Sequence, residues 1–173
     1  KIDLIAHCAG LMLSKQSNKL ESKDLLDSFM VNTIAPLSIT SNLTKQLSRS
    51  KGTVIALSSI ASKLDIPGEC IYSSTKAAAD MLVQACARTY NLPYLITRTC
   101  NNFGSNQHKE KFIPVIIDNV INEKPIPVYG DGQQSREWIW VEDNVNHIYN
   151  LMVSDYTGTQ NIGSKYSYRN LEI

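Results

Sequence analysis

Short apolar runs alternate along the chain with longer segments in which apolar residues recur every three or four positions. The runs are "KIDLIAHCAG" (1–10), "TVIALS" (53–58), "YLITR" (94–98) and the weaker "TQNIG" (159–163). Such runs are typical of buried strands in a parallel sheet. Helical spacing follows Ser22 and occupies 73–90, 111–122 and 141–152. This alternation predicts an α/β fold, with a parallel sheet between helices on both faces.

Several residues mark where these elements should end. Pro36 lies inside the first helical pattern and should kink or split that helix, because proline has no N–H to donate. The segment "IPVYGDGQQSREWIWV" (126–141) has a Gly-Asp-Gly turn between two apolar stretches. It predicts two short strands joined by that turn.

Composition excludes several classes of protein. Hydrophobic residues make up 43% and charged residues 19% of the 173 residues, and the net charge is +1. Nothing therefore indicates a nucleic-acid or membrane-surface partner. No apolar run is long enough to span a membrane. The four cysteines show no paired spacing, so we expect free thiols, no metal site and a cytoplasmic location.

Tyr72 and Lys76 stand four residues apart at the start of the predicted helix in "YSSTKAAAD" (72–80). Residues at this spacing are neighbours on a helix. A nearby ammonium lowers the pKa of a phenol, and a tyrosine acid or base needs this to work near neutral pH. The pair alone is weak evidence, since the same spacing occurs by chance in many helices.

Two further polar residues, Ser59 and Asn32, precede this pair in the chain. Ser59 lies 13 residues before Tyr72, at the end of a predicted strand, and Asn32 lies 27 residues before Ser59. The carboxyl ends of strands in an open parallel sheet are where ligands bind. His7 ends the first strand, but a lone buried histidine is more often structural than functional.

The residues 1–98 resemble the short-chain dehydrogenase/reductase superfamily. Its members place Asn-Ala-Gly after a strand, an asparagine in the next helix, a serine at the end of the following strand, and then Tyr-x-x-x-Lys. The resemblance implies that Ser59 hydrogen-bonds the substrate oxygen and that Tyr72 exchanges its proton. It also implies that Lys76 holds the nicotinamide ribose and lowers the pKa of Tyr72, and that Asn32 supports a proton-relay water.

The same resemblance implies NAD or NADP as the cofactor. Cys8, Ala9, Gly10, Tyr72 and Lys76 would contact it. No G-x-x-G-x-x-G turn occurs in the chain, although that turn brings the cofactor pyrophosphate to a helix N-terminus. We therefore expect either that the first βαβ units lie upstream of these residues or that the dinucleotide site has been lost.

The residues 98–143 resemble the nucleotide-sugar branch of this superfamily, above all the dTDP-glucose 4,6-dehydratases. The matching motifs are "RTCNNFGS", "EKFIP", "PVYGDG" and "REWIWVED". Arg136 offers a planar cationic fork to a pyrophosphate, and Lys111 adds a second charge. The other candidate substrate contacts are Asn101, Asn102, Pro127 and Tyr129. The alternative for Arg136 and Lys111 is solvated surface charge.

Two departures from the dehydratase pattern bear on the reaction. Dehydratases have Thr-Asp-Glu at the end of the strand, whereas this chain has "LSSIASK" (57–63) without a carboxylate; Asp65 and Glu69 come later in the loop. Tyr166 also replaces an asparagine near the end that, by the resemblance, would contact the nucleotide, and this departure leaves the base unassigned. Eliminating water needs an acid and a base that the strand end lacks. This absence favours oxidation and reduction at sugar C4, although Glu69 could serve as a substitute acid.

Together these features predict an NAD(P)-dependent nucleotide-sugar oxidoreductase or epimerase acting at C4 through Asn32, Ser59, Tyr72 and Lys76. The alternatives are a 4,6-dehydratase-like enzyme and a non-catalytic sugar-nucleotide-binding protein. We expect a partial Rossmann domain over 1–100 and a substrate-binding region over 101–173, part of a small C-terminal subdomain. By resemblance, helices at 22–49 and 73–90 would form a homodimer.

Overall fold

The computed structural model describes residues 1–13, 17–64, 66–128 and 130–173. These residues form two units, one comprising 1–99 and 151–161 and the other 100–150 and 162–173. Tyr129 and Asp65 lie outside the described residues. In the part of the chain that the structure describes, no helix is long and apolar enough to cross a membrane.

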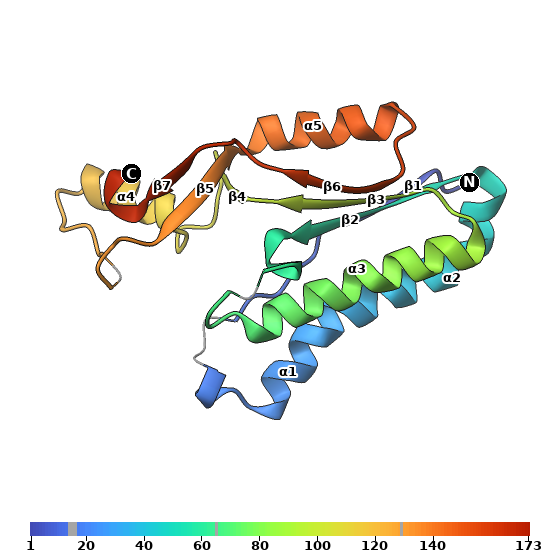
Figure 1. The fold of residues 1–173 in the computed structure, drawn as a ribbon, viewed down its shortest axis with the longest axis horizontal. Coiled ribbons are helices and arrows are strands. Elements are labelled where there is room, and N and C mark those ends of the chain that lie inside the picture. Colours follow the sequence, from blue (N-terminus) through green and yellow to red (C-terminus); the bar gives the residue numbers. More distant parts are fainter. Residues whose placement is uncertain (14–16, 65, 129) are drawn as a thin grey trace. The chain divides into compact units, whose positions relative to one another are not determined.

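The first unit is built on a four-stranded sheet. Its strands are β1 (Leu4–His7), β2 (Thr53–Ser59), β3 (Tyr94–Thr99) and β6 (Gly158–Ile162), in the order β1-β2-β3-β6. β2 pairs in parallel with β1 and with β3. In Figure 1 the arrowheads of β2, β3 and β6 lie at the same end of the sheet. The predicted α/β fold with a parallel, Rossmann-like sheet is confirmed.

Helices α1 (Ser22–Phe29), α2 (Ala35–Ser50) and α3 (Cys70–Tyr90) follow the predicted spacing. α2 and α3 lie side by side along one face of the sheet (Figure 1). The core between them and the sheet consists of Leu47, Val54, Ala56, Val83, Leu92 and Ile96. Gly52 lets β2 begin close to the preceding chain, because a Cβ there would lie 2.6 Å from the Ile2 carbonyl oxygen.

The predicted break at Pro36 takes the form of a π-helical turn, η2 (Met30–Ile34), between α1 and α2. Pro36 lies in the first turn of α2, where a missing N–H is tolerated. The Ala35 N–H bonds to the Met30 carbonyl oxygen, five residues back. The break therefore widens the helix for one turn, and this turn carries Asn32.

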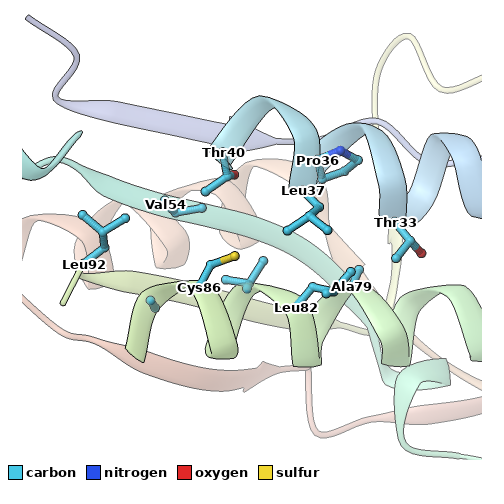
Figure 2. Close-up of a pocket in the computed structure, with 11 residues that line it drawn as sticks. Thr33, Pro36, Leu37, Thr40, Val54, Ala79, Leu82, Cys86 and Leu92 are labelled. Atoms are coloured by element: carbon cyan, nitrogen blue, oxygen red, sulfur yellow. The ribbon is translucent and has the colours of Figure 1, made fainter. Parts of the chain in front are cut away.

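A small apolar cavity of about 10 Å³ lies between α2, α3 and β2. Figure 2 shows Leu37, Val54, Leu82 and Cys86 directed toward it from these three elements. It is too small for a ligand, and its lining continues the hydrophobic core. The helices are thus packed closely on the sheet that carries the candidate site.

The second unit contains β4 (Asn101–Phe103), α4 (Phe112–Ile121), β5 (Ser135–Trp140) and β7 (Ser167–Arg169), with α5 (Val141–Val153) beginning directly after β5. Short helical turns are η1 (Ser17–Lys19) and η3 (Ile60–Ser62) in the first unit and η4 (Asn170–Glu172) in the second. β5 pairs in parallel with β4 and antiparallel with β7. The predicted strand before the Gly-Asp-Gly turn is wrong, since 124–128 form no strand and β5 finds its partners elsewhere.

Candidate functional site

Ser59 is the last residue of β2, at the carboxyl edge of the sheet. The 3₁₀ turn η3 follows at once, and the Ser59 Oγ accepts a hydrogen bond of 3.2 Å from the Ala61 N–H. Ser59 therefore caps this turn, and its hydroxyl is held by both the strand and the turn. The sheet thus presents a fixed hydroxyl at the edge where parallel α/β folds bind ligands.

Tyr72 and Lys76 lie on one face of the first turns of α3. The Lys76 Nζ is 5.8 Å from the centroid of the Tyr72 ring and donates a 3.0 Å hydrogen bond to the Leu57 carbonyl oxygen in β2. The Ser59 hydroxyl lies within hydrogen-bonding reach of the Tyr72 phenol. The structure therefore brings Ser59, Tyr72 and Lys76 together, as the spacing predicted.

Burial dominates the electrostatics of this group. It raises the pKa of Tyr72; the Ser59 hydrogen bond opposes the rise, and the nearby Glu69 carboxylate adds to it. Burial also lowers the pKa of Lys76, against Asp80 and Cys8, which raise it. The predicted lowering of the Tyr72 pKa by Lys76 is therefore not found in this structure, because loss of solvent around the phenol outweighs the hydrogen bond to it.

Asn32 is 2% exposed and connects two segments that flank the site. Its Oδ1 accepts a 2.6 Å hydrogen bond from the Leu11 N–H. Its Nδ2 donates to the Leu11 carbonyl oxygen at 2.8 Å and to the Thr75 Oγ1 at 2.9 Å. Pro36 has no N–H, so the usual helical bond from residue 36 to the Asn32 carbonyl cannot form. The Asn32 side chain thus joins the loop after β1 to the helix that carries Tyr72 and Lys76.

The exposed residues Cys8, Ala9 and Gly10 follow β1 at the same edge of the sheet. A Cβ on Gly10 would lie 3.4 Å from the Lys76 Nζ and 3.8 Å from the Asn32 Oδ1. The Gly10 backbone therefore passes directly beside both polar groups. His7 takes no part, since its Nε2 is 2.8 Å from the Thr40 Oγ1 on α2.

The arrangement fits a nicotinamide nucleotide. An ammonium has three N–H donors, and the bond to the Leu57 carbonyl uses one of them. Donors of this kind suit the vicinal hydroxyls of a ribose. The side-chain-free approach at Gly10 suits a ligand that lies along the strand ends.

Sequence reasoning missed two threonines that support the site. Thr75 is completely buried, accepts the bond from Asn32 and donates one of 2.8 Å to the Tyr72 carbonyl oxygen. The Thr33 hydroxyl donates to the Thr75 carbonyl oxygen at 2.9 Å. The only available signal was the position of Thr75 between Tyr72 and Lys76. Threonine is common enough in helices that this position alone predicts nothing.

The candidate substrate residues lie in the second unit and differ in their surroundings. Asn101 is exposed in β4, whereas the Asn102 Oδ1 accepts a 2.7 Å hydrogen bond from the Asn144 Nδ2. The Asn102 Nδ2 donates to the Cys100 carbonyl oxygen. Arg136 is exposed in β5, and its Nη1 donates to the Ser135 carbonyl oxygen.

Two further candidates flank α4. Lys111 precedes the helix, with its Nζ 3.5 Å from the Glu110 Oε1, and Pro127 is exposed in the segment that follows the helix. Tyr129 lies outside the described residues. Among the residues that the structure describes, these candidates of the second unit have different neighbours and lie in different elements.

No carboxylate occurs in the turn after Ser59. Ile60 is exposed, Ala61 is buried, and Ser62 donates a hydrogen bond of 2.9 Å to Asp80. Glu69 directly precedes α3, and its charge acts on the Tyr72 phenol. Among the described residues of the loop before α3, Glu69 is an acidic residue whose charge acts on Tyr72.

Comparisons with known proteins bear on the family and the fold of the chain. A family model described as the NAD dependent epimerase/dehydratase family matches residues 1–163. A dTDP-glucose 4,6-dehydratase of Haemophilus influenzae is 48% identical over 103 residues, which are 59% of this chain and 30% of that protein. The chain thus covers well under two thirds of the length of this curated relative.

Solved structures match over nearly the whole chain. A dTDP-glucose 4,6-dehydratase of Bacillus anthracis in complex with NAD is 27% identical, with a TM-score of 0.78, over 98% of this chain and 54% of that one. A UDP-glucuronic acid 4-epimerase of Bacillus cereus, in complex with UDP-glucuronic acid and NAD, has a TM-score of 0.82 at 21% identity. That match covers 99% of this chain and 57% of the epimerase, and at this identity it supports the fold alone.

Proposed function

Because the chain belongs to the NAD-dependent epimerase/dehydratase family, we propose that its protein is a nucleotide-sugar oxidoreductase or epimerase that acts at sugar C4. The observation that carries the proposal is the convergence of Ser59, Tyr72, Lys76 and Asn32 at one edge of the sheet. A hydroxyl, a phenol and an ammonium in this arrangement can bind a sugar hydroxyl and move its proton.

Tyr72 is the proton-transferring group. Its phenolate form takes the C4 hydroxyl proton as C4 is oxidised, and the resulting phenol returns that proton on reduction. Ser59 binds the same substrate oxygen from the strand end, where η3 holds its hydroxyl. Asn32 keeps the loop after β1 in place beside Lys76.

NAD or NADP would be held by Lys76, by Tyr72 and by the backbone of residues 8–10. The nicotinamide, when bound, would supply the hydride acceptor and donor for C4. Its oxidised ring is also a positive charge, which would lower the pKa of a neighbouring phenol. Lys76 would orient the ribose through donors that its bond to Leu57 leaves available.

The nucleoside diphosphate would be bound by the second unit. Arg136 and Lys111 supply positive charge for the pyrophosphate, and Asn101 and Pro127, with Tyr129, would contact the sugar or base. Asn102 would act by shaping β4, because its amide is engaged with Asn144 and Cys100.

A second candidate function is 4,6-dehydration of a dTDP-hexose. The named dehydratase relative and the position of Glu69 beside Tyr72 favour it. The turn Ile60–Ser62 disfavours it, because none of its side chains is an acid or base for the C5 and C6 positions. Glu69 would have to supply that acid.

The two candidates differ in the mass of the product. The full-length protein is incubated with NAD and dTDP-glucose labelled with deuterium at C4, and the product is followed by mass spectrometry and NMR. An unchanged mass with inverted C4 supports the epimerase, and a product lighter by one water supports the dehydratase. Reduction of a 4-keto sugar by reduced nicotinamide supports the reductase form. Nucleotide-sugar binding without any turnover contradicts both candidates and indicates a non-catalytic binding protein.

A further inference from the structure

A buried carboxylate, Asp80, connects three elements around the candidate site. It is 3% exposed, and its Oδ2 accepts hydrogen bonds of 2.9 Å from the Arg98 Nε on β3 and from the Ser62 Oγ on η3. Asp80 itself lies on α3, four residues after Lys76 and eight after Tyr72. One side chain therefore ties the helix of Tyr72 and Lys76 to the turn that Ser59 caps.

Asp80 also faces Lys76. Residues four apart on a helix lie on the same side, and both side chains line one cavity of about 20 Å³. The Asp80 Oδ1 is buried and has no hydrogen-bond partner among the described residues, and the same is true of the Ser58 Oγ in that cavity. Arg98 and Ser62 thus occupy one carboxylate oxygen, and the other has no hydrogen-bond partner among the described residues.

We propose that Asp80 is a positioning residue for the reaction: its carboxylate keeps the buried Lys76 in the charged form and, through Ser62, fixes the turn that holds Ser59. This inference rests on the proposed function, because it gives Lys76 and Ser59 their roles. A buried ion pair adds little stability over an apolar pair of the same size. We therefore assign the Asp80–Arg98 pair an electrostatic role toward Lys76, which lies one helical turn from Asp80.

The charged state of Lys76 depends on a small set of neighbours. Burial disfavours the ammonium, whose pKa Asp80 and Cys8 raise. Tyr72 lies beside Lys76 on α3, and His7 lines the same cavity from the end of β1. Arg98 faces Asp80 from β3. Of these groups, Asp80 is the one whose conservative replacement removes a negative charge without touching the substrate-facing hydroxyls.

The test is a direct titration of Lys76. Full-length protein is prepared with lysine isotopically labelled at Cε, the Lys76 resonance is assigned with Lys76→Arg, and its pH titration is followed by NMR. Asp80→Asn should move the Lys76 midpoint downward by about one pH unit. Asp80→Glu keeps the charge, so its Lys76 midpoint should equal that of the parent protein. Ser62→Ala should also leave the Lys76 midpoint unchanged.

Asp80→Asn leaves Arg98 as an unpaired buried charge and could unfold the protein. The double variant Asp80→Asn with Arg98→Gln removes both charges at nearly constant volume, and its Lys76 midpoint should lie below that of Arg98→Gln alone. An unchanged midpoint in the folded single variant, or in the double variant relative to Arg98→Gln, overturns the proposal.

Turnover supplies the second readout. The alkaline limit of kcat should move to lower pH in Asp80→Asn, with KM nearly constant. A uniform loss of kcat without any movement of that limit overturns the proposal and indicates a merely structural pair. If Tyr72→Phe keeps full turnover while the Lys76 midpoint still moves, the proposed function fails and the coupling of Asp80 to Lys76 stands.

Discussion

The Nζ atom of Lys76 lies 5.8 Å from the centroid of the Tyr72 ring. A second contact holds the ammonium in this position, since it also donates a hydrogen bond to the Leu57 carbonyl oxygen in β2. The cation is therefore fixed by the backbone of the sheet rather than by the phenol. A Lys76→Met variant keeps most of the side-chain volume and loses this charge, and we expect it to lose nicotinamide affinity. Fluorescence titration with reduced NAD measures that affinity, and unchanged binding would remove Lys76 from the cofactor site.

Asn32 should contribute to stability as well as to the site. Asn32→Ala removes three hydrogen bonds and leaves the N–H of the half-buried Leu11 without its acceptor. We expect the free energy of unfolding to fall by about 2–3 kcal/mol. The control is Asn42→Ala, an exposed position on α2 that should change stability by less than about 0.5 kcal/mol. Urea unfolding measures both; equal losses in the two variants would show that the Asn32 bonds do not hold the loop.

His7 should make the protein less stable as the pH falls. Burial lowers the pKa of His7 below its ordinary value of 6.5. The neutral ring is thus favoured in the folded state, so its contribution is fully present above the unfolded pKa and is lost as the pH falls through the folded pKa. His7→Gln should flatten the fall in stability below about pH 6.5, whereas His147→Gln, exposed on α5, should not. Unfolding at a series of pH values decides this, and equal slopes for all three proteins would refute it.

Exposed apolar residues on α1, η2 and α3 support the predicted dimer. Leu26, Met30 and Met81 are 68%, 53% and 65% exposed. Met81→Glu should shift the protein toward monomer, because a dimer through these helices would bury a charge without a partner. Ile121→Glu on α4, at a site 74% exposed, is the matched control. Sedimentation at micromolar concentration reports both, and a monomeric parent protein would contradict the dimer.

Arg136 should contribute to nucleotide affinity rather than to stability, because it is exposed and bonds only its neighbour's carbonyl among the contacts described. Arg136→Gln should weaken dTDP binding by about tenfold or more, the loss expected for one charged contact to a phosphate. Arg49→Gln on α2 removes an exposed arginine outside the second unit and should not. Calorimetric titration with dTDP compares the affinities of the two variants. Equal affinities would show that Arg136 is solvated surface charge and not a nucleotide contact.

The sequence predicted the sheet, the helices and the pairing of Tyr72 with Lys76, because these depend on periodicity and on spacing along single elements. Ser59, on a different element, was grouped with them through the family resemblance. The predicted strand before the Gly-Asp-Gly turn was wrong, since the described residues 126–128 form no strand and β5 instead pairs with β4 and β7, which are distant in sequence. Contacts of this kind leave no local pattern.

The electrostatic details could not be predicted for a related reason. Spacing places Lys76 beside Tyr72, but it does not reveal that burial raises the Tyr72 pKa. Nor does it reveal the contacts of Thr75, the Leu57 carbonyl or Asp80, each of which joins different elements. Such groups become visible only when the chain is folded.

The most direct test of the account is the reduction of NAD by a single turnover in Tyr72→Phe. Full-length protein carrying NAD is mixed rapidly with dTDP-glucose, and the absorbance of reduced nicotinamide is followed. The parent protein should show a transient rise, and Tyr72→Phe should slow it by about 10²–10⁴-fold without loss of helical circular dichroism. Tyr90→Phe, at an exposed position near the end of the same helix, should behave like the parent. A rise at the parent rate in folded Tyr72→Phe would contradict the central claim that Tyr72 transfers the proton.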